Sequence, residues 1–92
     1  MSEERETERT RTTVSIYGQQ YTIVSEDGAA HVKEVAQYVD QKMKEIRKRN
    51  PLLDTTRLAV LTALNVADDY VKMKKRIEQL EAKLKEEDET DV

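Results

Sequence analysis

The chain has 92 residues, of which 38% are charged and 37% hydrophobic, and its formal net charge is −3 at pH 7. It contains no cysteine, which excludes disulfides and thiolate chemistry, and no Phe or Trp, so a single copy has only a thin aliphatic core to bury. No apolar run approaches the ~20 residues that cross a bilayer. We therefore expect a cytoplasmic protein whose folding is coupled to self-association, an obligate oligomer.

The two ends of the chain are highly charged and lack the apolar pattern of a buried face. We expect residues 1–11 to form a disordered arm and residues 86–92 a disordered acidic tail. Between them the pattern predicts an α+β fold, in which a small ββα head over residues 12–56 precedes a long C-terminal helix over residues 57–85 that forms a coiled coil.

Two short strands are predicted on either side of Gly18. Val14 and Ile16 alternate with polar residues before it, and Tyr21 and Ile23 do so after it. Gly18 followed by Gln19 suits a tight hairpin turn. The hairpin residues expected to point outward form one candidate binding surface: Tyr17, Gln19, Gln20 and Thr22.

An amphipathic helix is predicted from residue 30 to residue 49. Ser25 or Asp27 can cap its start, and Asn50-Pro51 ends it. Its core-facing residues are Val32, Val35, Ala36, Val39, Met43 and Ile46. A basic cluster occupies its second half: Lys42, Lys44, Arg47, Lys48 and Arg49. These cations either complement the helix dipole or form a docking patch for an acidic protein or for phosphates.

The long helix, capped by Asp54 or Thr55, carries an apolar stripe with heptad spacing, which is typical of left-handed coiled coils. We assign this stripe to self-association: Ala59, Ala63, Val66, Tyr70, Met73, Ile77, Leu80 and Leu84. A second apolar face in the first half is expected to pack inside the head: Leu58, Val60, Leu61, Leu64, Ala67 and Val71. Charges beside the stripe favour a parallel homodimer, in which Arg76 faces Glu81 of the other copy.

The sequence offers little for catalysis. His31 is the only histidine and has no cysteine near it, so we expect no metal site. We find no glycine-rich phosphate loop and no nucleophile–base pair. The expectation is a protein without enzymatic activity, cofactor or small-molecule substrate.

Three segments, VSIYGQQYTI, VKEVAQYVDQKM and RLAVLTALNVADDY, resemble the ZapA family of bacterial cell-division proteins. The resemblance covers Val14 to about Leu84. It implies a non-enzymatic protein at the mid-cell division site that binds the tubulin-like GTPase FtsZ, cross-links its protofilaments, promotes bundling and Z-ring assembly, and thereby reduces its GTPase activity. It also implies parallel dimers that can form antiparallel tetramers. The FtsZ-facing surface of the family maps to Gly18-Gln19-Gln20, although some relatives carry a basic residue where this chain has Gln19.

The alternative is a ribbon–helix–helix DNA-binding regulator, in which Thr13, Ser15 and Tyr17 would read the major groove. Two strands per chain, the negative net charge and the long apolar stripe argue against nucleic acid as the partner.

Overall fold

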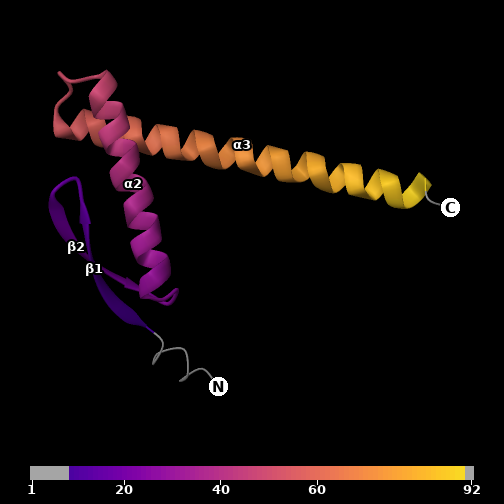
Figure 1. The fold of residues 1–92 in the computed structure, drawn as a ribbon, viewed down its shortest axis with the longest axis horizontal. Helices are drawn as coiled ribbons and strands as arrows, with labels where there is room; N and C mark the ends of the chain where they lie inside the picture. The colour runs from indigo at the N-terminus through magenta and orange to yellow at the C-terminus, as the bar shows by residue number, and fades with distance from the viewer. Residues whose placement is uncertain (1–8, 91–92) are drawn as a thin grey trace. The chain divides into compact units, whose positions relative to one another are not determined.

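The computed structural model describes residues 9–90 and has the predicted α+β fold, with a hairpin followed by two helices (Figure 1). The chain divides into two compact units, one through Thr62 and one from Ala63 onward, so the first unit extends beyond the predicted head boundary at residue 56. The elements are β1 (Thr10–Ile16), β2 (Gln19–Ser25), α2 (Ala29–Arg49) and α3 (Thr55–Thr90).

The two strands form an antiparallel hairpin whose last pair is Ile16 with Gln19. The turn is therefore Tyr17-Gly18, one residue earlier than the predicted Gly18-Gln19. Both turn residues have positive φ, 51° for Tyr17 and 80° for Gly18, as a type I′ turn requires. This backbone matches the twist of the flanking strands, so the strands pair without a bulge up to the turn.

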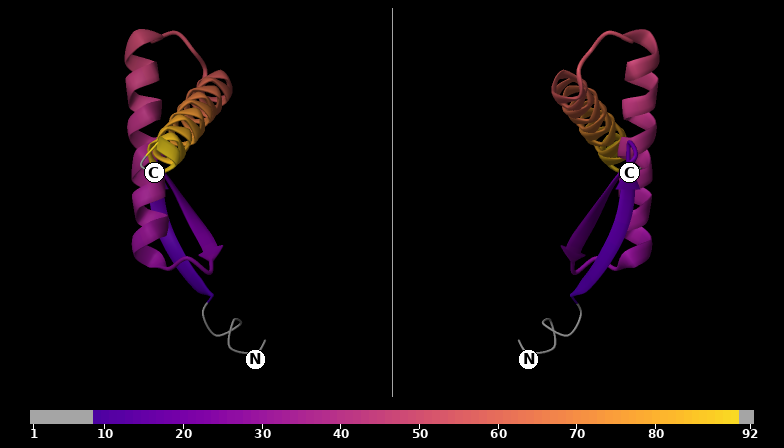
Figure 2. Two further views of the ribbon diagram at one scale, coloured as in Figure 1. Left: turned by 90° about the vertical axis from the view of Figure 1, so that its right-hand side faces the viewer. Right: turned by 90° about the vertical axis from the view of Figure 1, so that its left-hand side faces the viewer.

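Helix α2 packs on β1 and lies alongside the hairpin (Figure 2). One core cluster joins Val14 of β1 to Val32 and Ala36 of α2. A second cluster joins Met43 and Ile46 of α2 to Leu58, the first buried residue of α3. The predicted core face of α2 is thus confirmed at four positions, whereas Val35 is exposed.

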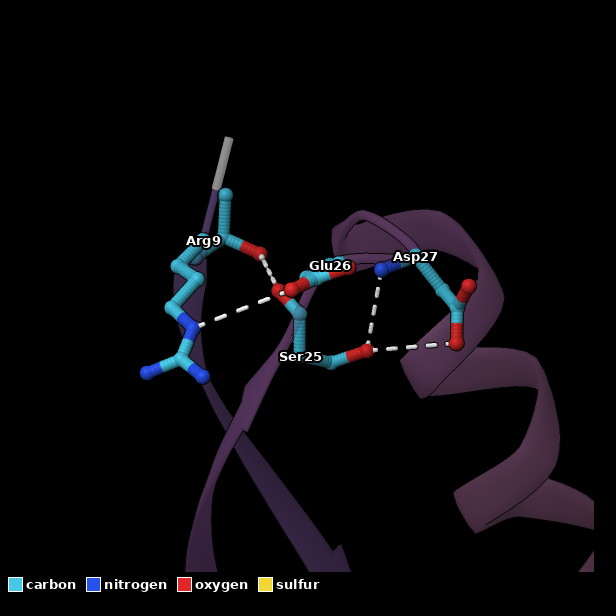
Figure 3. A network of polar contacts seen from close by, with 5 residues as sticks. Arg9, Ser25, Glu26 and Asp27 are labelled. Carbon is cyan, nitrogen blue, oxygen red and sulfur yellow. Dashed lines mark hydrogen bonds and ion pairs between the residues drawn. The ribbon is translucent and has the colours of Figure 1, made fainter. Parts of the chain in front are cut away.

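The connection from β2 to α2 is a compact polar turn (Figure 3). The Ser25 hydroxyl accepts a hydrogen bond from the Asp27 N–H at 3.0 Å, and Arg9 lies 3.9 Å from Glu26. The residue that caps α2 is Gly28, with φ 89° and no side-chain cap. The prediction that Ser25 or Asp27 caps the helix is therefore wrong, because the Ser25 side chain is engaged within the preceding turn.

The end of α2 and the start of α3 carry the predicted capping residues. Asn50 caps the end of α2. Its backbone N–H donates a hydrogen bond to the Ile46 carbonyl at 2.9 Å, and its side-chain amide donates to the same oxygen. Asp54 caps the start of α3: its carboxylate accepts a hydrogen bond from the Arg57 N–H at 2.8 Å. Capping of this kind satisfies an N–H group that has no partner within the helix.

Both predicted disordered ends are too long. Strand β1 already begins at Thr10, whose hydroxyl donates a hydrogen bond to the Ser25 carbonyl. The last two residues of the predicted arm 1–11 therefore belong to the sheet. Helix α3 continues to Thr90, through most of the predicted tail 86–92. Glu and Lys are good helix formers, and Gly and Pro are absent after Pro51, so nothing in the sequence interrupts this helix. The remaining parts of these predictions, residues 1–8 and 91–92, lie outside the described residues.

Candidate interaction surfaces

The predicted self-association stripe lies exposed along α3. Its five C-terminal members are between 43% and 64% exposed: Tyr70, Met73, Ile77, Leu80 and Leu84. Of the earlier members, Ala59 and Ala63 are exposed and Val66 is half-buried. A row of large apolar side chains at heptad spacing in contact with water is the surface that a second helix covers in a coiled coil.

The second apolar face of α3 is also mostly uncovered. Leu58 is fully buried and Leu61 half-buried, but Val60, Leu64 and Val71 are exposed. Within a single copy, the predicted packing of this face inside the head is therefore seen only at Leu58 and Leu61. The first half of α3 therefore presents two adjacent apolar stripes to its surroundings.

The hairpin turn is attached to α2 by a carboxylate. The Tyr17 N–H donates to Asp40 Oδ1 at 2.7 Å, and Lys44 Nζ lies 2.9 Å from Asp40 Oδ2. The Tyr17 N–H, followed by the Lys44 ammonium, holds the pKa of Asp40 below its ordinary value of 3.8. The carboxylate is therefore charged at neutral pH and uses both of its oxygens.

Asp40 is a functional candidate that the sequence did not reveal. In the sequence, Asp40 is one of several carboxylates at polar positions of the predicted helices. A usable signal existed, because Asp40 follows Ala36 by four residues and precedes Met43 by three, which places an acid on the buried stripe of α2. The backbone N–H that it accepts could not be foreseen.

Two of the four hairpin candidates do not point outward as predicted. Tyr17 is half-buried and packs against the cluster of Met43, Ile46 and Leu58. Its positive φ costs about 1–2 kcal/mol for a residue with a Cβ, which its packing and the Asp40 hydrogen bond offset. Gln19 is exposed but lies opposite Ile16, on the side of the hairpin that faces α2.

The outer face of the hairpin carries uncharged polar side chains near the turn, with Arg11 and Val24 at its far end. Gln20 lies opposite Ser15, and Thr22 lies opposite Thr13, with the two threonine hydroxyls 3.3 Å apart. All four are exposed. Directly opposed residues share one face of a sheet, so these side chains form a flat surface with donors and acceptors available. Gln20 and Thr22 are therefore the predicted contact residues that the structure places there.

The basic cluster on α2 is heterogeneous. Lys44 pairs with Asp40, Lys42 lies 5.6 Å from the centroid of the Tyr38 ring, and the guanidinium of Arg47 donates to the Leu53 carbonyl. Lys48 and Arg49 are exposed in the last turn of α2. The first three cations have structural contacts within the head, so the last two are the better candidates for a partner.

A hollow of about 230 Å³ lies beside the turn, lined by Ile16, Tyr17, Gln19, Tyr21, Met43 and Thr55. A second hollow of about 260 Å³ lies between the hairpin and α2 and includes Val14, Ile23 and Val35. Both are predominantly apolar. The second hollow is also lined by Ser25, Asp27 and His31, of which the Ser25 hydroxyl donates a hydrogen bond to the Asp27 carboxylate at 3.3 Å.

Within residues 9–90 we find no group of three or more His, Asp or Glu side chains placed to hold a metal ion. In the same part of the chain, neither helix has a stretch apolar enough to cross a membrane.

Known proteins resemble this chain over most of its length. The family model described as "Cell division protein ZapA" matches residues 12–90. The protein named cell division protein ZapA of Halalkalibacterium halodurans is 60% identical over 78 residues, which are 85% of this chain and 86% of that protein. The Bacillus subtilis protein of the same name is 56% identical over 80 residues, 87% of this chain and 94% of that protein.

Two solved structures share the fold. A ZapA mutant dimer from Geobacillus stearothermophilus is 47% identical, with a TM-score of 0.67 over 84% of this chain and 90% of that one. A conserved bacterial protein of unknown function from Pseudomonas aeruginosa is 33% identical, with a TM-score of 0.68 over 84% of this chain and 86% of that one. The dimer supports self-association for this fold. On the family match and these identities, the chain belongs to the ZapA family of cell division proteins.

Proposed function

We propose that this chain binds FtsZ through its ββα head and cross-links FtsZ protofilaments because α3 joins copies of the chain together. Bundling and Z-ring assembly at the mid-cell division site, in the cytoplasm, follow from the cross-linking, and reduced FtsZ GTPase activity is its consequence. The observation that carries the proposal is the exposed heptad stripe of α3, from Tyr70 to Leu84.

Self-association is supported by the chemistry of that stripe. Met73, Ile77 and Leu80 are large, apolar and between 43% and 62% exposed, and burying each would contribute on the order of 1 kcal/mol or more. Parallel pairing in register brings Arg76 to Glu81 and Asp69 to Lys74 of the other copy, which selects orientation more than it adds stability. The same stripe is available to an antiparallel tetramer.

Cross-linking requires at least two separate FtsZ-binding surfaces on one assembly. A single head bound to one filament bridges nothing, whereas two heads held by one coiled coil engage two filaments. Each contact can be weak, because many such contacts along two polymers add through effective concentration.

For the FtsZ-binding surface we propose the outer face of the hairpin, with Gln20 and Thr22, together with the exposed end of the basic cluster, Lys48 and Arg49. Gln19, which is exposed beside the turn, is included in the proposed FtsZ-binding surface. Tyr17, Lys42, Lys44 and Arg47 support this surface through their contacts inside the head. The resemblance that maps FtsZ contacts to the turn is the source of this assignment.

The test replaces the stripe while leaving the head intact. In the double variant Ile77→Glu and Leu80→Glu, two carboxylates enter the apolar seam, and we expect loss of self-association in analytical ultracentrifugation. Sedimentable FtsZ bundles should disappear, while binding of the variant to FtsZ polymers persists at reduced avidity.

The matched control is Gln79→Glu with Ala82→Glu. It adds the same two charges at neighbouring positions on the side of the helix away from the stripe. This control should dimerise and bundle FtsZ like the wild type. Unchanged bundling by the stripe variant, once it is shown to be monomeric, would refute the proposal.

The family assignment does not favour the DNA-binding alternative. In a ribbon–helix–helix protein one strand from each chain pairs across the dimer, whereas here β1 pairs with β2 of its own chain.

A further inference from the structure

We propose that Asp40 is a positioning residue for the FtsZ-binding hairpin: by accepting the Tyr17 N–H it fixes the turn and thereby determines which side chains of β2 face outward. The inference rests on the proposed function, since it concerns the surface proposed to contact FtsZ. Asp40 itself is not expected to touch FtsZ.

The turn needs stabilisation from outside the hairpin because of its first residue, Tyr17. Two-residue turns of this type favour Asn or Gly where φ is positive, yet this chain has Tyr17 with φ 51°. An aromatic residue is strained there. Its N–H also lies beyond the last strand pair, Ile16 with Gln19, so it makes no hydrogen bond between the two strands. Asp40 supplies the acceptor at 2.7 Å.

The hold matters for binding because the turn sets the strand register. With Tyr17-Gly18 as the loop, Gln20 and Thr22 lie opposite Ser15 and Thr13 on the outer face. A shift of pairing by one residue would turn these side chains toward α2 and bring Tyr21 to the outside. Burial of side chains opposes such a shift only weakly in this hairpin, because Tyr21 and Ile23 of β2 are exposed in the present register and would lose little buried surface.

Asp40 is distinguished from an ordinary helix carboxylate by comparison with Asp68. Both lie 2.9 Å from the ammonium of a lysine four residues later, Lys44 and Lys72. The Asp68 side chain is 57% exposed, whereas that of Asp40 is 19% exposed and also accepts the turn N–H. Asp68 is therefore a matched control for the loss of a helix ion pair.

The experiment uses the full chain with Asp40→Ala, Asp40→Asn and Asp68→Ala. Binding to preassembled FtsZ polymers is measured by cosedimentation, and hydrogen exchange of the Tyr17 amide is measured by NMR. We expect Asp40→Ala to bind FtsZ at least fivefold more weakly and to exchange the Tyr17 amide at least tenfold faster. Asp40→Asn retains an oxygen acceptor and should restore both, and Asp68→Ala should match the wild type.

Equal FtsZ binding by wild type and Asp40→Ala overturns the inference, and so does loss of binding by Asp40→Asn while its Tyr17 amide stays protected. If Asp40→Ala does not fold, the wild-type amide decides: exchange as fast as that of Gly18 shows that Asp40 does not hold the turn. If the wild type itself fails to bind FtsZ, the proposed function fails, and the amide exchange still reports separately on the Asp40 contact.

Discussion

Val14 and Tyr21 lie directly opposite each other in the hairpin, yet Val14 is 6% exposed and Tyr21 is 47% exposed. Opposed residues share a face, so both side chains are on the side of α2. The difference arises because α2 packs on β1 and leaves β2 at the margin. The hairpin therefore contributes one strand to the core and presents the other to its surroundings.

The burial of Val14 predicts unequal costs for the same substitution at two valines on opposite faces of the hairpin. Val14→Ala removes buried methyl groups from the cluster with Val32 and Ala36 and should lower the free energy of unfolding by about 1.5–2.5 kcal/mol. Val24→Ala, at a half-exposed position of the same hairpin, should cost about 0.5 kcal/mol or less. Urea denaturation at one fixed protein concentration measures both. Equal costs would contradict the burial assigned to Val14.

The hairpin shows which structural features the alternation of apolar and polar residues can predict. Alternation correctly predicted the shared face of Val14 and Tyr21, because side chains of a strand alternate between its two sides. It could not predict which strand the helix covers. The same limit applies to Val35, which fits the apolar stripe of α2 but lies at its exposed edge.

On α3, the heptad spacing predicted a long helix with an apolar stripe, and both are present. The pattern did not reveal that Leu64 and Val71 would be exposed in a single copy of the chain. Apolar periodicity shows that a face becomes buried but not whether the covering element belongs to the same chain. In a self-associating protein, the sequence pattern therefore does not distinguish a face buried within one chain from a face buried between two chains.

Leu58 should be the most sensitive position in the first compact unit. Its side chain is fully buried, against Met43 and Ile46, where it joins the start of α3 to the end of α2. Leu58→Ala should destabilise the protein by about 2–5 kcal/mol. Leu52→Ala is the control, since Leu52 is 98% exposed, and it should be nearly neutral. Thermal unfolding at matched concentrations compares them, and a similar loss in both variants would contradict the assigned core.

The contact between Asp40 and Tyr17 should disappear on acidification. The Tyr17 N–H and the Lys44 ammonium lower the pKa of Asp40 in the folded state below 3.8. A depressed carboxyl pKa contributes stability above the unfolded-state value, and that contribution is lost as the pH falls through the folded-state value. The chemical shift of the Tyr17 amide should therefore titrate with a midpoint below pH 3.8. Asp40→Asn should abolish this titration, and a midpoint at or above the ordinary value would contradict the prediction.

The exposed end of the basic cluster should act through charge. Arg47 is engaged with the Leu53 carbonyl, so the informative variant reverses only its neighbours, Lys48→Glu and Arg49→Glu. We expect about tenfold weaker binding to FtsZ polymers at low salt, and a flatter salt dependence, because fewer screened attractions remain. Lys33→Glu with Lys75→Glu changes the net charge equally at other exposed positions and should bind like the wild type. If these two cations serve only the helix dipole, their reversal lowers the melting temperature and leaves FtsZ binding and its salt dependence unchanged.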